Sequence, residues 1–369
     1  MDKKYNFDDI VKNFKFEGEF IEAKSHVCGH INDTFVLIFE KEDKSKVSYI
    51  LQRINTNIFK NPQELMANIE NVTEHIKNKI IKEGGNPLRE TLNIIKTINN
   101  EKFYITDEND YFRAFIYITD AKTYQVVEEP IHMYKCGKAL GKFQKQLSDF
   151  EVDKLYETIK DFHHTKKRYD MFLESVKADP LKRVEGIKDD IDFVIDRAKD
   201  CDILVNMIEE GKMPLRVTHN DTKFNNIMID EKSDEAIAVI DLDTVMPGLI
   251  AYDFGDSIRS GATTALEDET ELSKVKFDMN LYENFVKGFL QETKNSLDTL
   301  EIEYLPFGAK LMTFECGMRF LMDYIDGDIY FKIHKETHNL DRARNQFKLV
   351  TDMERNMDKM KEIVIKYSK

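Results

Sequence analysis

The sequence lacks the features that usually mark a metal, redox, secreted or membrane protein. Its four cysteines, at positions 28, 136, 201 and 316, lie far apart and form no C-x-x-C pair. This spacing argues against a metal or redox role and suits a reducing compartment. No stretch is long and apolar enough for a membrane span. The N-terminal segment MDKKYNFDDIVKNFKF mixes Asp and Lys with its apolar residues, unlike a signal peptide. We therefore expect a cytoplasmic protein.

Internal repeats, low-complexity tracts, linkers rich in Pro or Gly and a basic stripe are also missing. The 369 residues are enough for two globular units with separate cores. Charged residues make up 33% and hydrophobic ones 41%, the balance of an ordinary globular enzyme. The formal net charge of -14 disfavours nucleic acid and anionic membranes as partners. We expect neither partner, and the sequence does not indicate an oligomeric state.

The first third of the chain has the pattern of strands with one helix. The helix begins at Pro62 and places Leu65, Ile69, Val72 and Ile76 three and four residues apart. The strand segments are rich in β-branched and aromatic residues. We predict strands at 19–28, 33–40, 47–54, 102–106 and 111–118.

Beyond Asp120 the pattern becomes mainly helical, with a few short apolar strands. The sequence therefore predicts an α+β protein with a small antiparallel sheet in residues 1–118 and a mainly helical domain in residues 119–369. A short hinge near 117–123 would join them. Helices are expected at 131–148, 188–209, 278–293, 303–325 and 340–366, and short strands at 215–218, 226–230 and 236–241.

The segment HNDTKFNNIMID, residues 219–230, carries the strongest chemical signal. It matches the pattern H-x-D-x-x-x-x-N of kinase catalytic loops, in which the Asp accepts the substrate hydroxyl proton and the Asn binds a metal. Phosphoryl transfer needs a positioned nucleophile and neutralised phosphate charge more than covalent help. Asp221 is therefore the candidate base and Asn226 a candidate metal ligand. Lys223 is placed to reach the transferring phosphoryl group.

A second segment, AVIDLD at residues 238–243, supplies further carboxylates. Asp241 ends an apolar strand, where kinases place a metal-binding Asp, and Asp243 is a weaker candidate for the metal. Each of these residues alone could be a turn or cap residue. Their joint order, spacing and strand context predict a kinase that uses ATP and Mg2+.

These segments resemble the superfamily of aminoglycoside phosphotransferases and choline kinases, which implies a bilobal protein-kinase-like fold. A narrower resemblance, to kinases of N-acetylhexosamines, covers most of the chain from residue 28 to residue 350. It implies transfer of phosphate to the anomeric C1 hydroxyl of a sugar such as GlcNAc or GalNAc. The segments that carry it are CGHINDTF, YILQRINTNIF, HNDTKFNNIMID, AVIDLDTVMPGLIAYDFGDSIRSG, MRFLMDYIDGDIYFK and HNLDRARNQFKLV.

The narrower resemblance also implies the residues that contact the sugar. They would be His30, Asp221, Arg319 and Tyr330, since a neutral sugar needs converging hydrogen-bond partners and an aromatic face. Other roles remain open for three of them. Arg319 could be an ion-pair residue on a helix, Tyr330 could only pack, and His30 could cap a turn.

The nucleotide-binding part fits kinase patterns less well, because the sequence has no G-x-G-x-x-G loop. The turn before residue 33 could still cover the phosphates through Asn32 and Thr34. Gln52 or Arg53 stands where a kinase has its phosphate-binding Lys, and the strand register decides which of them points inward. Adenine recognition is expected at the hinge backbone, near Tyr117 to Thr119.

Several other functions remain open. A related kinase could act on choline, ethanolamine, homoserine or an aminoglycoside, although a quaternary ammonium prefers an aromatic cage with Trp and the chain has none. A protein kinase is disfavoured, because Asp253-Phe254-Gly255 lies too far after Asp221; we expect Asp253 to hold the loop instead. A catalytically silent binding protein would usually have lost the base, Lys223 or a metal ligand.

Overall fold

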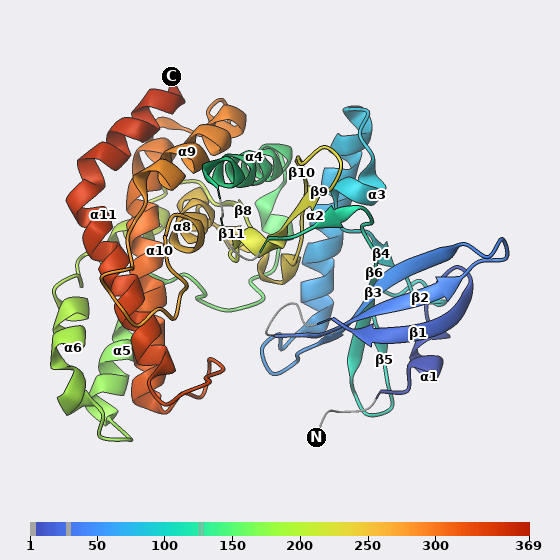
Figure 1. Cartoon of the computed structure of the whole chain (residues 1–369), viewed down its shortest axis with the longest axis horizontal. Coiled ribbons are helices and arrows are strands. Elements are labelled where there is room, and N and C mark those ends of the chain that lie inside the picture. Colours follow the sequence, from blue (N-terminus) through green and yellow to red (C-terminus); the bar gives the residue numbers. More distant parts are fainter. Residues whose placement is uncertain (1–4, 27–30, 125–126, 128) are drawn as a thin grey trace. The chain divides into compact units, whose positions relative to one another are not determined.

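The computed structural model describes residues 5–26, 31–124, 127 and 129–369, and the chain divides into two units (Figure 1). The first unit contains Met1–Lys122, Asp153–Ile159 and Met228–Met246, and the second contains Thr123–Val152, Lys160–Ile227 and Pro247–Lys369. The first unit thus extends to residue 122 and also takes in two short segments from farther along the chain. The assignment of residues 1–118 to nucleotide binding stays a prediction.

An antiparallel sheet forms the centre of the first unit. Its strand order is β1-β2-β3-β6-β4, and β5 pairs with β6. Side chains alternate between the two faces of the sheet, and Leu37, Leu51 and Ala114 are completely buried. Apolar residues of helix α1 (Phe7–Val11) belong to the same hydrophobic core. The strands are β1 (Glu19–Ser25), β2 (Asp33–Glu40), β3 (Lys46–Ile54), β4 (Ile94–Ile95), β5 (Tyr104–Ile105) and β6 (Tyr111–Ile116).

Two helices and a smaller sheet complete the first unit. Helix α2 (Pro62–Lys82) begins with Asn61 as its cap, followed by Pro62, as the sequence predicts, and α3 is the short helix Pro87–Glu90. The smaller sheet has the order β10-β9-β7. Its strands are β7 (Ala121–Lys122), β9 (Ile227–Asp230) and β10 (Ala236–Val239), and the 3-10 turn η4 (Leu242–Thr244) follows β10.

The second unit is mainly helical, which with the sheet of the first unit confirms the predicted α+β class. A two-stranded sheet pairs β8 (Arg216–Thr218) with β11 (Met246–Gly248). The short 3-10 turns η1 (Val152–Lys154), η2 (Val184–Ile187) and η3 (Phe224–Asn226) lie in connecting segments. The helices are α4 (Pro130–Gln146), α5 (Thr165–Ala178), α6 (Lys188–Ile195), α7 (Asp200–Glu209), α8 (Ile250–Gly261), α9 (Met279–Thr293), α10 (Thr299–Asp326) and α11 (His338–Ser368).

One predicted helix is wrong in its extent. The sequence predicts a single helix over 188–209, but the structure has α6 and α7 with a turn between them. The turn sequence Asp196-Arg197-Ala198-Lys199 has no large apolar residue to continue the buried stripe. Arg197 instead pairs with Glu354, at 2.8 Å, and its guanidinium lies 3.5 Å from the centre of the Phe193 ring.

Helix α8 has no simple apolar stripe, because eleven of its twelve residues are buried. A helix covered on every side shows no amphipathic period in its sequence. Its close packing depends on Gly255, where an added Cβ would lie 2.4 Å from the carbonyl oxygen of Gly308 on α10. This helix carries the acidic residues that hold the loop after β8.

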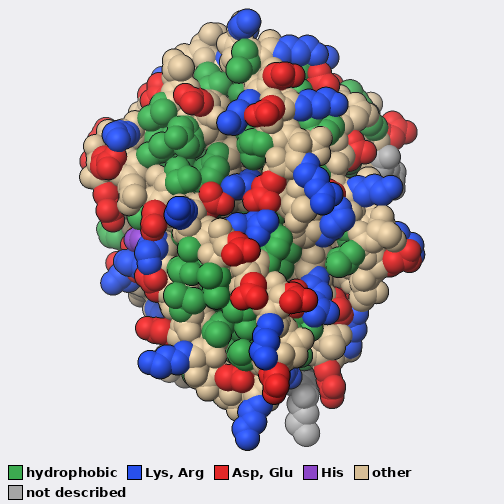
Figure 2. Space-filling view, turned by 90° about the vertical axis from the view of Figure 1, so that its left-hand side faces the viewer, with side chains coloured by type: hydrophobic (Ala, Val, Ile, Leu, Met, Phe, Trp, Pro, Cys, Tyr) green, Lys and Arg blue, Asp and Glu red, His purple; other side chains and the backbone are tan. Residues whose placement is uncertain are grey.

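Within the described residues, no helix is both long and apolar enough to cross a membrane. Figure 2 shows acidic and basic side chains interspersed over one face of the molecule. The net charge of -14 is therefore not gathered on that face as a patch of one sign.

Candidate active site

The loop that contains Asp221 is held by buried acidic side chains of α8. The two carboxylate oxygens of Asp253 accept the backbone N–H groups of His219 and Asn220, each at 2.8 Å. Asp253 is 1% exposed and also accepts a hydrogen bond from Nε2 of Gln144 at 2.8 Å. Asn220 has a φ of 62°, a conformation that Asn tolerates better than most residues. The prediction that Asp253 holds the loop is confirmed.

A second acidic residue of α8 holds the next turn of the loop. The Asp256 carboxylate accepts the backbone N–H of Thr222 at 2.8 Å, and the Thr222 hydroxyl donates to the Asp253 carbonyl at 2.7 Å. Arg259 pairs with Asp256, at 2.8 Å, and with Glu267, at 2.7 Å. The backbone on both sides of Asp221 is therefore attached to one buried helix.

Asp221 and Lys223 form an ion pair, with Nζ 2.8 Å from Oδ1. Burial raises the pKa of the Asp221 carboxyl, but the surrounding positive charges, with the Lys223 ammonium the foremost of them, together lower it to below its ordinary value. The Asp221 charge in turn raises the pKa of Lys223. At neutral pH the loop thus carries a carboxylate base beside an ammonium group.

Asn226 closes the loop from the other end. Its Nδ2 donates to the backbone carbonyl of Asp221 at 2.8 Å and lies 3.4 Å from Oδ2 of the same residue. Because the nitrogen side of the amide is turned toward Asp221, Oδ1 lies on the opposite side. An amide oxygen is a hard ligand of the kind that Mg2+ accepts.

Replacing Lys223 by Met is expected to move the acid limb of the kcat–pH profile to higher pH. As the predicted base, Asp221 acts in its carboxylate form, so activity is expected above its pKa and is lost as the pH falls through it. Lys223 lowers that pKa, so its removal raises the pKa and moves the loss of activity to higher pH.

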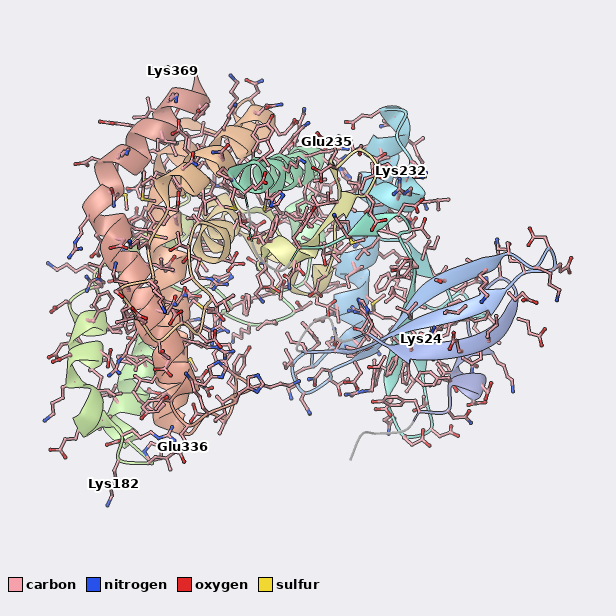
Figure 3. The ribbon with its side chains drawn as sticks, viewed as in Figure 1. Lys24, Lys182, Lys232, Glu235, Glu336 and Lys369 are labelled. Atoms are coloured by element: carbon pink, nitrogen blue, oxygen red, sulfur yellow. The ribbon has the colours of Figure 1, made fainter. Side chains whose placement is uncertain are left out.

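The pH profile is measured at saturating substrate for the wild type and for Lys223→Met. Lys232→Met is the matched control, because the Lys232 side chain is 82% exposed at the turn after β9 (Figure 3). The control profile should coincide with that of the wild type. An acid limb that stays in place in Lys223→Met would contradict the proposed electrostatic effect.

In the first unit, four of the predicted residues lie close to a buried arginine. Asn32 Nδ2 donates to Oδ2 of Asp243 at 2.6 Å, and Gln52 Nε2 donates to the Thr34 hydroxyl at 3.1 Å. Arg113 of β6 contacts both pairs: its Nη2 lies 2.6 Å from Oδ1 of Asp243 and 2.8 Å from Oε1 of Gln52. The structure therefore brings together Thr34 of β2, Gln52 of β3, Asn32 in the turn before β2 and Asp243 in the segment after β10.

Asp241 immediately precedes the turn η4 as its N-cap residue, with a φ of 61° and a ψ of 56°. This left-handed conformation is uncommon for residues other than Gly, Asn and Asp, and such backbone conformations cluster at functional sites. Asp243, two residues later, is 5% exposed and is already engaged by Arg113 and Asn32. These contacts favour a role for Asp243 in positioning the neighbouring backbone over the predicted role as a metal ligand.

Gln52 and Arg53 point to opposite faces of β3. Arg53 pairs with Asp33, at 2.7 Å, and lies 3.8 Å from Asp110. The Tyr5 hydroxyl donates to the same Asp33 carboxylate at 2.8 Å. Gln52 shares its face with Thr34 and Arg113, so it is the stronger candidate for a nucleotide contact.

Arg89 holds the backbone of the predicted hinge segment. Nη2 of Arg89 donates to the carbonyl oxygens of Thr119 and Asp120, at 2.8 and 3.2 Å, and pairs with Asp230 at 2.8 Å. Tyr117 is half-buried, and Thr119 is exposed. The expected adenine contacts at this backbone stay a prediction.

Two of the predicted sugar contacts meet in the second unit. The Arg319 guanidinium lies 5.4 to 5.7 Å from the ring centres of Phe162, Tyr330 and Phe331. Within the described part of the chain no hydrogen bond or ion pair of Arg319 is present. Tyr330 is 57% exposed. His30 lies outside the described residues, so its predicted role stays untested.

The loop that presents Tyr330 depends on a buried carboxylate that the sequence did not single out. Asp323, 4% exposed, accepts the backbone N–H groups of Ile329, Tyr330 and Phe331, at 2.8 to 3.0 Å. Asn339 Nδ2 donates to the same carboxylate at 2.9 Å. The available signal was Asp323-x-x-x-Gly327, an acid at the end of a helix that stops at a glycine with a φ of 103°.

Comparison with known proteins shows the family to which the chain belongs. The model of the phosphotransferase enzyme family matches residues 88–288. This range covers more than half of the chain, so the chain belongs to the phosphotransferase enzyme family.

Solved structures of similar fold support the kinase-like architecture. An aminoglycoside phosphotransferase from Alicyclobacillus acidocaldarius has a TM-score of 0.64 at 11% identity, covering 99% of this chain and 98% of that one. The amicoumacin kinase hAmiN has a TM-score of 0.56 at 15% identity, covering 93% of both chains. A choline kinase from Cryptosporidium parvum has a TM-score of 0.54 at 14% identity, covering 94% of this chain and 92% of that one.

Proposed function

We propose that this protein is an ATP-dependent kinase that phosphorylates the anomeric C1 hydroxyl of N-acetylhexosamines. The observation that carries the proposal is the loop around Asp221. The loop backbone donates hydrogen bonds to Asp253 and Asp256, and the Asp221 carboxylate lies 2.8 Å from the Lys223 ammonium. A base held this firmly, with a cation beside it, suits phosphoryl transfer.

In the proposed reaction, Asp221 orients the C1 hydroxyl of the sugar and accepts its proton. The hydroxyl oxygen forms a bond to the γ-phosphorus as the bond to the bridging oxygen of ATP breaks, and ADP leaves. Lys223 neutralises charge that develops on the transferring group. When the substrates bind, the Lys223 ammonium has to leave the Asp221 carboxylate and contact the phosphoryl group instead.

ATP and Mg2+ are the proposed co-substrate and metal. Nucleotides are bound in related folds: the amicoumacin kinase structure contains AMP-PNP and Ca2+, and a spectinomycin phosphotransferase contains ADP. Asn226 and Asp241 each offer a side-chain oxygen of the hard kind that Mg2+ prefers, and Mg2+ keeps several waters besides its protein ligands. The metal would neutralise phosphate charge when bound.

The surroundings of Arg319 favour a neutral sugar over a cationic acceptor. The three rings that could form a cage for an ammonium group already contact the Arg319 guanidinium. A second cation there would meet the positive charge of Arg319, whereas hydroxyl and acetamido oxygens can accept the N–H groups of the guanidinium. Choline, ethanolamine, homoserine and aminoglycosides remain the alternative acceptors; solved structures of an aminoglycoside phosphotransferase, an ethanolamine kinase and a choline kinase have a similar fold.

An acceptor panel tests this proposal. ADP release is measured with MgATP and GlcNAc, GalNAc, glucose, galactose, choline, homoserine or kanamycin. We expect turnover of the N-acetylhexosamines. In Arg319→Met the KM for the sugar should rise by about tenfold or more, with the KM for ATP unchanged. Turnover of choline or kanamycin alone would keep the kinase mechanism and reject the sugar.

A further inference from the structure

A buried cation lies in the first unit on the strand next to the one where protein-kinase-like folds place a lysine. That lysine, on the third strand, normally contacts the nucleotide phosphates. In this chain β3 carries Gln52 at the inward-facing position, and the strand register places Arg113 of β6 directly opposite Gln52. Arg113 is 1% exposed. A charge so deeply buried has to be paired and hydrogen-bonded.

The contacts of Arg113 fix both the guanidinium and the amide of Gln52. Nε and Nη2 of Arg113 both donate to Oε1 of Gln52, at 3.0 and 2.8 Å. Nη1 lies 3.8 Å from the sulfur of Met66, and the guanidinium lies 5.3 Å from the centre of the Phe115 ring. Because the Gln52 oxygen is occupied by two donors, the amide cannot turn over without losing both.

This arrangement gives Gln52 a defined donor side. One N–H of its Nε2 donates to the Thr34 hydroxyl at 3.1 Å, and an amide nitrogen has a second N–H. Gln52 is half-buried, so the donor side is not sealed inside the sheet. At the position of the usual ammonium group, β3 therefore presents an N–H donor whose direction depends on Arg113.

Arg113 also holds the segment that follows Asp241. Its Nη2 lies 2.6 Å from Oδ1 of Asp243, whose other oxygen accepts Nδ2 of Asn32 at 2.6 Å. The Asn32 oxygen in turn accepts the backbone N–H of Asn55 at 3.0 Å. One guanidinium thus connects β3, the turn before β2 and the turn η4.

We propose that Arg113 replaces the missing strand lysine as a positioning residue for the triphosphate of ATP. It supplies the positive charge of this region and orients the Gln52 amide, so that Gln52 donates an N–H to a phosphate oxygen. Through Asp243 it also sets the position of η4. The inference rests on the proposed use of ATP and is independent of the identity of the acceptor.

Relocating the charge tests the proposal. The dissociation constant of MgATP is measured on the full chain without any acceptor. Arg113→Met should weaken MgATP binding by about 30-fold, because a charge and an oriented donor are lost together. Adding Gln52→Lys to that variant should restore affinity to within about threefold, because the new ammonium stands on β3 and can pair with Asp243. Gln52→Lys alone places two cations side by side and should not strengthen binding.

Two further variants separate positioning from folding. Arg113→Met with Asp243→Asn leaves no unpaired buried carboxylate, and it should still bind MgATP weakly. Arg197→Met removes an arginine–carboxylate pair of the second unit, in which Nη2 of Arg197 lies 2.8 Å from Glu354. This control should lower the melting temperature and leave MgATP affinity unchanged.

The outcomes distinguish this inference from the proposed function. If Arg113→Met lowers the melting temperature but not the MgATP affinity, or if Gln52→Lys gives no recovery, Arg113 is structural and the inference is overturned. A wild type that binds MgATP but phosphorylates no sugar would reject the acceptor assignment and leave this test valid. A wild type that does not bind MgATP would overturn both.

Discussion

Asp221→Asn is expected to lower kcat by at least about a thousandfold while MgATP affinity stays within about threefold. The amide has nearly the shape of the carboxylate but cannot accept the hydroxyl proton. It also loses the charge that pairs with Lys223 at 2.8 Å. The loop should keep its path, because the bonds from Asp253 and Asp256 to the backbone do not involve the Asp221 side chain.

Steady-state kinetics and a direct MgATP binding measurement check this prediction together. Asp358→Asn is the control, since Asp358 is an exposed residue of α11. It should have wild-type kinetics. If Asp221→Asn kept more than about a tenth of the wild-type kcat, Asp221 would orient the acceptor without serving as the base.

Asp253→Asn is expected to lower kcat by about 30- to 100-fold and to destabilise the second unit by about 2 kcal/mol. The two carboxylate oxygens accept the N–H groups of His219 and Asn220, each at 2.8 Å. In the variant, one oxygen is replaced by an NH2 group that faces a buried N–H. The Asp221 backbone then loses part of its support, and small displacements of a catalytic group cost rate.

A matched variant separates this effect from ordinary loss of stability. Asp278 caps α9 and also accepts two backbone N–H groups, those of Asn280 and Leu281, at 2.8 and 3.0 Å. Thermal unfolding and kcat are measured for Asp253→Asn and Asp278→Ala, since an Asn at position 278 would keep the Oδ1 acceptor of both bonds. Both should unfold at lower temperature, and Asp253→Asn alone should lose kcat in the folded enzyme. Equal kcat values would show that Asp253 supports the fold and not the loop geometry.

The loop around Asp221 could be recognised as a candidate site because its chemistry is local in sequence. The spacing between Asp221 and Asn226 places both side chains on one loop, and in the structure Asn226 donates to the Asp221 carbonyl at 2.8 Å. The role of Asp253 was also accessible, as an acid on the segment after the loop. Asp256 was missed, because α8 is buried on nearly every side and its sequence shows no stripe that marks which residues face the loop.

The buried cluster of the first unit could not be predicted, because it depends on strand register. Adjacent residues of a strand point to opposite faces, so the sequence leaves Gln52 and Arg53 as equal candidates. The register of β3 against β6 places Gln52 opposite Arg113. A single Arg in the apolar strand YFRAFI signals a paired charge, but its partner Asp243 lies 130 residues later and cannot be identified from spacing.

The most direct test of the central claim is phosphorus NMR of the reaction mixture with MgATP and GlcNAc. We expect ATP to be converted to ADP with the appearance of one new phosphomonoester. That signal should couple to the anomeric proton and disappear on mild acid treatment, as for a sugar 1-phosphate. ADP accompanied only by inorganic phosphate, or a phosphomonoester on another hydroxyl, would contradict the account.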